Sequence, residues 1–330
     1  MIVYEQTESL DLASLPRPRV VTLGVFDGLH LGHQHLVRRV VEQARAHAHA
    51  RDGGSAVVFT FANHPLAVLA PPYAPKQLLS PERKARMLER MGVDALVAPP
   101  FTHEIASMPP EVFIEETLLG RCRADRIVVG FDFRFGVDGR GDTRVLAEAS
   151  RTRGFELEIL PAVYHGGWLV SSTRIRDLLE EGRVRLESEM LGRPYDLSGR
   201  VVHGYGRGRA LGYPTANLQF DPAYVEPASG VYAVLAALED GRLYPGMMNI
   251  GAGPTFADAE HRAEVFLFDY DGETLYDSAL RVYFVERLRE ERKFGSTEEL
   301  QSRLRVDEKI ARALLEAFPG RANPDELAGE

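Results

Sequence analysis

Two histidines three residues apart, His30 and His33, are the side chains of this sequence best placed for phosphate chemistry. They close a Gly-rich stretch, residues 24–33, which follows the apolar run 20–23 and precedes the apolar-spaced segment 36–41. This pattern predicts a buried strand, a turn and the start of a helix. Free backbone N–H groups and the helix dipole favour phosphates there. Two imidazoles in that position can donate hydrogen bonds to phosphoryl oxygens that gain charge during transfer.

The histidine pair has two other interpretations. A zinc site would need a third ligand, and no cysteine or well-placed partner is evident nearby. The histidines can also be helix-surface residues without a chemical role. The surrounding glycines and the strand–turn–helix context favour phosphate binding, and the sequence lacks the GxxxxGK[ST] loop of a P-loop kinase.

A second predicted helix start, within residues 170–176, also carries phosphate-binding groups. Ser172 and Thr173 have the hydroxyls that cap helices, and Arg176 offers a planar fork to a polyphosphate. An ordinary capped helix with surface arginines is the alternative.

In the second half, Gly204, Gly206 and Gly208 alternate with other residues shortly before the hexapeptide Gly-Tyr-Pro-Thr-Ala-Asn at residues 212–217. Alternate glycines allow close approach of the backbone to an anion, although a flexible hairpin loop explains them equally well. The hexapeptide is more specific, and its alternative is a proline turn with a capping asparagine.

Glu264 lies in an alternating segment that predicts a strand with Glu264, Phe266 and Phe268 on one face. A carboxylate among phenylalanines is unusual on a solvent face. A partly buried glutamate with a raised pKa makes a competent general base. A paired charge on an edge strand is the other interpretation.

The elements that must position these residues differ between the two halves. The first half alternates strands and helices, which predicts a parallel sheet covered on both faces, with ligands at the carboxyl ends of its strands. The expected strands are residues 20–25, 56–61, 95–98, 127–130 and 157–160. The expected helices are residues 33–50, 81–91, 110–119, 143–153 and 173–181.

The pattern changes after about Arg183, where short apolar runs with turn residues predict an antiparallel barrel or sandwich. The expected strands are residues 199–203, 230–238, 242–250, 263–270 and 280–288, followed by a helix at 297–317. We therefore expect two domains, residues 1–185 and 186–330.

Composition excludes several classes of protein. The net charge of −9 argues against a general nucleic-acid binder. The single cysteine, Cys122, rules out an internal disulfide and a cysteine zinc site and fits a reducing cytoplasm. No signal peptide is predicted, and no apolar run approaches the ~20 residues that span a bilayer. We expect a cytoplasmic protein that acts on small molecules, with no nucleic-acid or membrane partner; its oligomeric state is not predicted.

Several of these motifs resemble those of one family. Residues 24–33 resemble the HxGH signature of the nucleotidylyltransferase superfamily, and residues 170–176 its SSTxxR signature. Residues 60–65 and 129–136 resemble the FMN-adenylyltransferase half of bacterial bifunctional riboflavin kinase/FAD synthetases, and 212–217 resembles the PTAN signature of the riboflavin kinase domain. The resemblance extends from about residue 20 to 315. Departures from the family pattern are Asn63 in place of a common proline, Phe266 in place of histidine and Asp277 in place of glycine.

The resemblance implies a Rossmann-like α/β nucleotidylyltransferase domain with a parallel sheet, followed by an antiparallel β-barrel riboflavin kinase domain with a terminal helix. It also implies two reactions with Mg²⁺: phosphorylation of riboflavin by ATP, and adenylylation of FMN by a second ATP to give FAD and pyrophosphate. No bound flavin is expected as a cofactor, because riboflavin, FMN and FAD are substrates and products.

The resemblance further implies roles for individual residues. The catalytic residues are His30, His33, Arg176 and Glu264. ATP is bound by Gly24, Phe26, Asp27, Gly32, Ser172, Thr173, Gly204, Gly206, Gly208, Thr215 and Asn217, of which Thr215 and Asn217 also bind Mg²⁺. The flavin is bound by Asn63, His64, Asp132, Phe133, Arg289 and Phe294.

Three of these assignments have simpler interpretations. The aromatic run 131–135 can be plain core, and Arg289 and Phe294 can belong to a charged segment that opens a helix. Three other functions also remain as alternatives: a monofunctional nucleotidylyltransferase with a flavin-sensing β-domain, a flavin-binding regulator without activity, and a cytidylyltransferase acting on an alcohol phosphate.

Overall fold

The computed structural model describes residues 1–5, 12–46, 53–204, 208, 211–251, 262–272 and 274–318. The chain divides into two compact units, Met1–Ser171 (unit 1) and Ser172–Glu330 (unit 2), which are described separately. Among the described residues, no helix is long and apolar enough to cross a membrane.

Unit 1 is built on a six-stranded parallel sheet with the strand order β1-β4-β3-β2-β5-β6. Every residue of β2, β3 and β4 is buried, as expected for a sheet covered on both faces. The strands are β1 (Ile2–Tyr4), β2 (Arg19–Leu23), β3 (Ser55–Phe59), β4 (Ala95–Val97), β5 (Arg126–Gly130) and β6 (Glu156–Leu160). The predicted α/β domain is thus confirmed. The edge strand β1 was not expected, because a run of three residues is short for a strand; Ile2 and Val3 are exposed.

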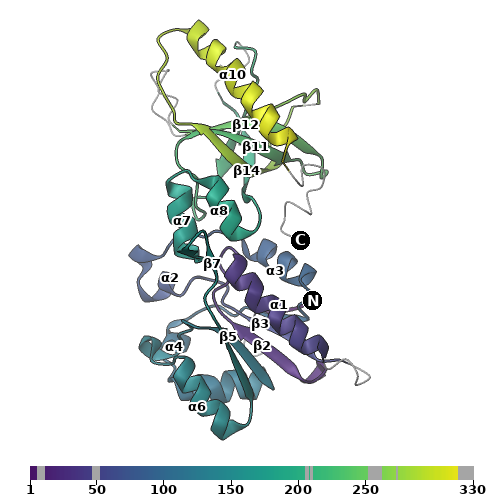
Figure 1. Ribbon diagram of the computed structural model, residues 1–330, viewed down its shortest axis with the longest axis vertical. Coiled ribbons are helices and arrows are strands. Elements are labelled where there is room, and N and C mark those ends of the chain that lie inside the picture. Colours follow the sequence, from purple (N-terminus) through teal and green to yellow (C-terminus); the bar gives the residue numbers. More distant parts are fainter. Residues whose placement is uncertain are drawn as a thin grey trace. The chain divides into compact units, whose positions relative to one another are not determined.

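The helices of unit 1 connect these strands, and α1 packs against β2, β3 and β5 (Figure 1). Helix α3 begins at Pro81 after Ser80, whose hydroxyl accepts the N–H of Arg83. The helix expected at 110–119 continues from α5 as a π-helix, η3. The helices are α1 (Leu31–Ala46), α2 (Leu66–Leu69), α3 (Pro81–Arg90), α4 (His103–Ala106), α5 (Pro110–Val112), η3 (Phe113–Arg121) and α6 (Thr143–Arg153), with short 3-10 turns η1 (Leu12–Ser14), η2 (Pro71–Tyr73) and η4 (Val137–Gly139).

Unit 2 contains a closed antiparallel barrel with the strand order β10-β13-β12-β11-β14-β9. The closed barrel settles the choice between barrel and sandwich. Helix α10 (Thr297–Glu316) packs against β11, β12 and β14 and contributes Ala311 and Leu315 to the core of the unit (Figure 1). The strands are β9 (Tyr195–Val202), β10 (Ala216–Phe220), β11 (Gly230–Ala237), β12 (Leu243–Gly251), β13 (Arg262–Leu267) and β14 (Ala279–Arg289).

Several elements differ from the sequence-based expectation. Strand β10 and helix α8 (Val184–Leu191) were not expected, nor was the small hairpin of β7 (Tyr164–His165) and β8 (Trp168–Leu169). Strand β13 ends at Leu267, so the alternation of Glu264 and Phe266 does not extend to Phe268, which is fully buried.

The boundary between the two compact units follows Ser171, so it lies earlier in the sequence than the change of pattern near residue 183. Helix α7 (Ser172–Glu180) packs against α8, and α8 packs against β14 and β9 of the barrel. Both helices therefore belong to unit 2 by packing. The functional boundary between residues 185 and 186 stays a prediction.

Candidate active sites

The strand order of unit 1 places the histidine loop where parallel sheets bind ligands. The chain passes from β2 to β3 and β4 on one side, then crosses to β5 on the other side of β2. Strand order reverses at this point, and ligands of open α/β sheets bind beyond the carboxyl ends of the strands there. The histidine loop follows β2, and Asp132 and Phe133 follow β5.

The loop between β2 and α1 is buried and strongly turned. Phe26, Gly28 and Leu29 all have positive φ angles, of 50°, 82° and 45°. Residues other than glycine adopt this conformation only where the surrounding structure imposes it. The side chains of Phe26 and Leu29 are fully buried and so anchor the turn.

His30 and His33 stack on each other at the end of this loop. Their ring centroids are 3.6 Å apart with an interplanar angle of 15°. The backbone N–H of His33 donates to Nδ1 of His30 at 3.3 Å, so the proton of a neutral His30 lies on Nε2. A Cβ at Gly32 would lie 3.2 Å from the His30 ring, which explains the glycine between the two histidines.

Electrostatics favour a neutral His33. Burial lowers its pKa well below the usual 6.5, and the neighbouring His30 and Lys84 lower it further. At neutral pH, His33 can therefore offer an imidazole N–H group to a phosphate without carrying charge.

The other residues predicted to bind ATP in this loop have structural contacts. The Phe26 side chain packs against the His33 ring, with centroids 5.1 Å apart, so an ATP contact from Phe26 would come from its backbone. The Asp27 carboxylate is 6% exposed and accepts the backbone N–H of Leu78 at 2.9 Å. The N–H of Gly24 donates to the carbonyl of Phe59.

Asn63 and His64, predicted to bind flavin, follow β3. The Asn63 side chain pairs with the backbone of Phe101 through two hydrogen bonds, of 3.2 and 2.7 Å. Nδ1 of His64 accepts the N–H of Leu66 at 3.1 Å, at the start of α2. These contacts fix the backbone at the position where the family has a proline.

Asp132 and Phe133 lie in the turn after β5 rather than in a strand. Asp132 is exposed, and the half-buried Phe133 ring stacks on Phe135, with centroids 5.5 Å apart and planes at 15°. Phe135 is part of the hydrophobic core of unit 1 and Phe133 packs against that core, as the plain-core interpretation predicts.

Ser172, Thr173 and Arg176 all lie on α7, which begins at Ser172. The predicted helix start is confirmed, and Thr173 is exposed at its first turn. This helix belongs to unit 2, whereas the histidine pair belongs to unit 1.

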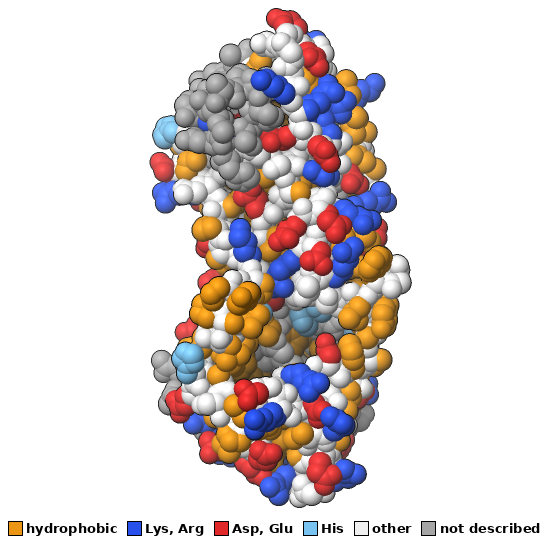
Figure 2. Space-filling view, turned by 90° about the vertical axis from the view of Figure 1, so that its left-hand side faces the viewer, with side chains coloured by type: hydrophobic (Ala, Val, Ile, Leu, Met, Phe, Trp, Pro, Cys, Tyr) orange, Lys and Arg blue, Asp and Glu red, His pale blue; other side chains and the backbone are white. Residues whose placement is uncertain are grey.

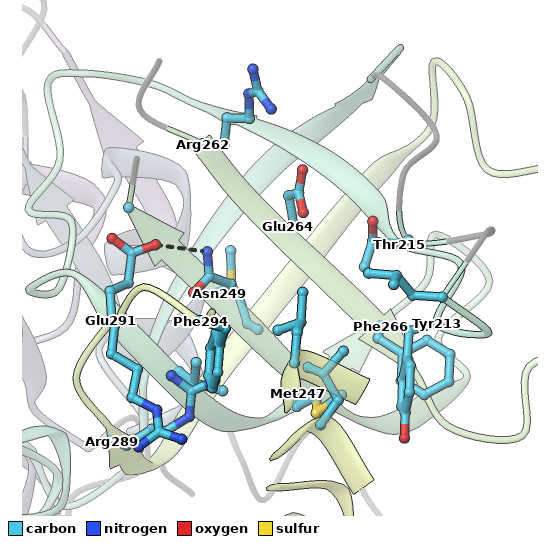
Figure 3. Close-up of a pocket in the computed structure, with 18 residues that line it drawn as sticks. Tyr213, Thr215, Met247, Asn249, Arg262, Glu264, Phe266, Arg289, Glu291 and Phe294 are labelled. Carbon is cyan, nitrogen blue, oxygen red and sulfur yellow. Dashed lines mark hydrogen bonds between the residues drawn. The ribbon is translucent and has the colours of Figure 1, made fainter. Parts of the chain in front are cut away.

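The barrel of unit 2 holds a pocket that brings together most of the residues predicted there (Figure 3). Strand register places Glu264 directly opposite Asn217 on β10 and opposite Asn249 on β12. Cross-strand partners have Cβ atoms about 4.5–5.5 Å apart. Glu264 is therefore flanked by two amides. The pocket is lined by Gly208, Leu211, Tyr213, Thr215, Val231, Met247, Met248, Asn249, Gly251, Arg262, Glu264, Phe266, Arg289, Glu291, Arg292, Phe294, Leu300 and Leu304.

Glycines bring the backbone close to the predicted metal ligands. A Cβ at Gly204 would lie 2.1 Å from Nδ2 of Asn217, and one at Gly208 would lie 3.1 Å from Oγ1 of Thr215. No larger residue fits at Gly204 unless Asn217 moves. Gly206 lies outside the described residues.

One wall of the pocket is an ionic network that the sequence did not indicate. Nε of Arg289 donates to Oδ2 of Asp307 at 2.8 Å, and Arg303 pairs with the other carboxylate oxygen. Asp307 is fully buried on α10. The guanidinium of Arg289 also lies over the Phe294 ring, 5.5 Å from its centroid. Arg289 is thus fixed from two sides.

Asn249 and Glu291 form a second polar pair that sequence reasoning missed. Nδ2 of Asn249 donates to Oε1 of Glu291 at 3.1 Å, drawn as the dashed line in Figure 3. Gly251, with φ of 147°, lies against this carboxylate. The segment Asn-Ile-Gly at residues 249–251 was the available signal.

Metal binding by acidic, histidine or cysteine clusters is not indicated. Among the described residues there is no group of three or more such side chains able to hold a metal ion. On the face drawn in Figure 2, acidic and basic side chains are intermingled, without a broad basic patch.

Comparison with protein families assigns the two parts of the chain separately. Residues 12–174 match the family described as FAD synthetase, and residues 191–315 match the family described as riboflavin kinase. Helix α7 thus spans the end of the first match, and α8 lies largely between the two.

Curated relatives match both parts together. The Bacillus subtilis (strain 168) bifunctional riboflavin kinase/FMN adenylyltransferase is 36% identical over 296 residues, which cover 88% of this chain and 91% of that protein. The Pseudomonas fluorescens protein of the same name is 38% identical and covers 89% and 92%. A crystal structure of a Streptococcus pneumoniae protein, titled a macrolide-efflux protein, superposes with a TM-score of 0.82 at 34% identity, over 94% of this chain and 98% of that one.

The two family matches follow the order along the chain expected from the histidine and PTAN motifs, and the curated relatives span about nine-tenths of the sequence. This chain belongs to the bifunctional riboflavin kinase/FMN adenylyltransferase family of transferases.

Proposed function

We propose that the pocket of the barrel phosphorylates riboflavin and that the histidine loop of unit 1 serves the adenylylation of FMN. The chain would thus convert riboflavin to FMN with one ATP and FMN to FAD with a second, releasing pyrophosphate. The observation that carries the kinase assignment is that Asn217 and Glu264 lie opposite each other on β10 and β13, with Thr215 directly before β10 and in the same pocket as Glu264.

In the kinase reaction, Glu264 takes the proton of the riboflavin hydroxyl that attacks the γ-phosphorus of ATP. Its half-buried carboxylate lines the pocket, and Asn217 and Asn249 lie opposite it in the strand register on its two sides. A base held in this way can contact a hydroxyl within hydrogen-bond distance. The remaining catalysis is positioning and charge stabilisation.

Mg²⁺ fits the oxygen atoms available in the barrel. The Thr215 hydroxyl and the Asn217 amide oxygen are hard neutral ligands, which suit a cation that also keeps waters and phosphate oxygens. The backbone at Gly204 and Gly208 lies close to Asn217 and Thr215, beside the proposed cation site. When bound, the metal neutralises developing phosphate charge.

In the proposed kinase site, the apolar and aromatic part of the pocket binds the flavin. Phe266 and Tyr213 pack edge to face with centroids 5.0 Å apart, and Met247 lies opposite Phe266 in the strand register. Arg289 and Phe294 form the neighbouring wall. These surfaces suit a flat, largely apolar ring with polar edges.

In the adenylyl transfer, the FMN phosphate is already a nucleophile at neutral pH, so no strong base is needed. His30 and His33 donate hydrogen bonds to the oxygens on the α-phosphorus as their charge increases. The hydrogen bond from the His33 N–H to Nδ1 of His30 places the proton of a neutral His30 on Nε2. The assignment of Ser172, Thr173 and Arg176 to the β- and γ-phosphates rests on the resemblance of residues 170–176 to the family motif.

The test follows each flavin product separately. Purified protein receives riboflavin, ATP and Mg²⁺, and FMN and FAD are resolved by chromatography. Wild type is expected to form both. His30→Ala is expected to form FMN with FAD production reduced roughly 10²–10³-fold, the typical effect of removing one oxyanion donor. Glu264→Gln is expected to leave riboflavin unreacted and to convert supplied FMN to FAD.

Matched controls exist on the same elements. His35→Gln changes an exposed histidine of α1, and Glu286→Gln changes a half-buried carboxylate of β14 outside the pocket lining. Both are expected to retain both activities. Loss of the same single step in His30→Ala and Glu264→Gln would contradict the assignment of two separate sites.

A further inference from the structure

A lysine that no sequence motif indicated lies against the histidine loop of unit 1. Lys84 is on α3, and its ammonium donates to the backbone carbonyl of Val25 at 2.9 Å. The Thr60 hydroxyl, at the end of β3, donates to the same carbonyl at 3.0 Å. Val25 directly precedes the turn of positive φ at residues 26–29. Two different elements therefore fix the backbone at the point where this turn begins.

The contact matters because the loop is buried. A backbone carbonyl has two lone pairs, and since Thr60 and Lys84 both donate to Val25, loss of Lys84 would remove one of two hydrogen bonds that hold this carbonyl. Neighbouring loop atoms are fixed in the same way: Gln34 donates to the carbonyl of Leu29 at 2.9 Å, and Asp27 accepts from Leu78. Among these contacts, the one from Lys84 brings a full positive charge to the histidine site.

The ammonium of Lys84 has more hydrogen-bond donors than the contact with Val25 uses. It carries three N–H donors, and Val25 is its one hydrogen-bond acceptor among the described residues. Burial lowers the pKa of Lys84, and the carboxylate of Asp27 opposes this shift. Lys84 stays close enough to His33 for its charge to lower the pKa of that imidazole.

We propose that Lys84 is a positioning residue for adenylyl transfer: it holds the Val25 carbonyl, and through it the turn that presents His30 and His33 to the reacting phosphate. This inference rests on the proposed function of the histidine loop. The same charge disfavours a proton on His33. The ionisable groups around this imidazole are His30 in the stacked ring and Lys84 on α3, with Asp27 facing Lys84.

The first test is the rate of FAD formation from FMN and ATP in Lys84→Met. Loss of a charged hydrogen bond that positions catalytic groups predicts a rate decrease of about 10- to 100-fold at saturating substrates. Phosphorylation of riboflavin in the barrel is expected to be unchanged, which would show that the effect is confined to unit 1. Arg86→Met, which removes an exposed cation of the same helix, is the matched control and is expected to retain both rates.

The second test distinguishes positioning from a merely structural role. The imidazole of His33 is titrated by NMR in the full-length protein, with the signal assigned from His33→Gln. Lys84→Met is expected to raise the pKa of His33, since one neighbouring positive charge is gone. Lys84→Arg keeps the charge and is expected to leave the titration of His33 close to that of wild type.

Two results would overturn the inference. One is FAD formation in Lys84→Met within threefold of wild type; the other is a His33 titration that is the same in Lys84→Met and wild type. Should Lys84→Met not fold, a raised His33 pKa in Lys84→Arg would overturn it equally. A wild-type protein that forms no FAD would instead contradict the proposed function itself.

Discussion

Replacing Asp307 by asparagine would test how the barrel holds Arg289 at the pocket. Asp307 is fully buried on α10 and is contacted by Arg289 and Arg303, each at 2.8 Å. Asparagine keeps the volume of the side chain and removes its charge. Two arginines would then lie beside a neutral amide in a site closed to water on the Asp307 side.

The structure sets the expected magnitude. Removing one partner of a fully buried ion pair typically costs about 3–5 kcal/mol. The side chains of Arg289 and Arg303 are 14% and 29% exposed, so partial hydration reduces the penalty. We expect the free energy of unfolding of unit 2 to fall by about 2–3 kcal/mol. For a domain of this size the melting temperature should fall by about 4–12 °C.

The assay combines thermal unfolding with the two activities. Asp307→Asn is expected to lower the melting temperature and to raise the KM for riboflavin, because Arg289 loses the hydrogen bond that fixes it at the pocket. Conversion of FMN to FAD should persist at temperatures below the transition.

Asp269→Asn is the matched control for this experiment. It makes the same chemical change in another carboxylate paired with an arginine of α10, Arg312, but at an exposed position. Exposed ion pairs contribute little to stability, so little change in melting temperature is expected. Equal melting temperatures for Asp307→Asn and Asp269→Asn would refute the argument from burial.

Three further predictions concern unit 2 and the metal. Gly204→Ala should lower riboflavin phosphorylation roughly 10²-fold by displacing Asn217, with FAD formation from FMN retained, measured by the same chromatographic assay. Burial raises the pKa of Glu187 well above 4.5, so its folded form keeps a proton that the unfolded chain releases, and stability should fall as pH rises from 4.5 towards the folded pKa. Glu187→Gln should remove this dependence, with a melting temperature that exceeds wild type by more at pH 8 than at pH 5. Chelation with EDTA should stop both reactions, and added Mg²⁺ should restore them.

The local parts of both sites could be predicted from the sequence because they depend on short-range patterns. A buried strand, a glycine turn and a helix start are encoded within about fifteen residues around His30 and His33. The same holds for Thr215 and Asn217, which share one hexapeptide, and for Glu264, whose alternation with apolar residues marks one face of a strand.

The tertiary structure decided which distant residues support these groups. Lys84 on α3 donates to Val25 in the loop after β2. Asn249 lies opposite Glu264 because β12 and β13 pair in this register. Asp307 contacts Arg289 because α10 packs on the barrel. Each contact joins residues that are far apart in the sequence, and no periodic pattern relates one residue to the other. Such contacts follow from how strands pair and helices pack, which local sequence patterns do not specify.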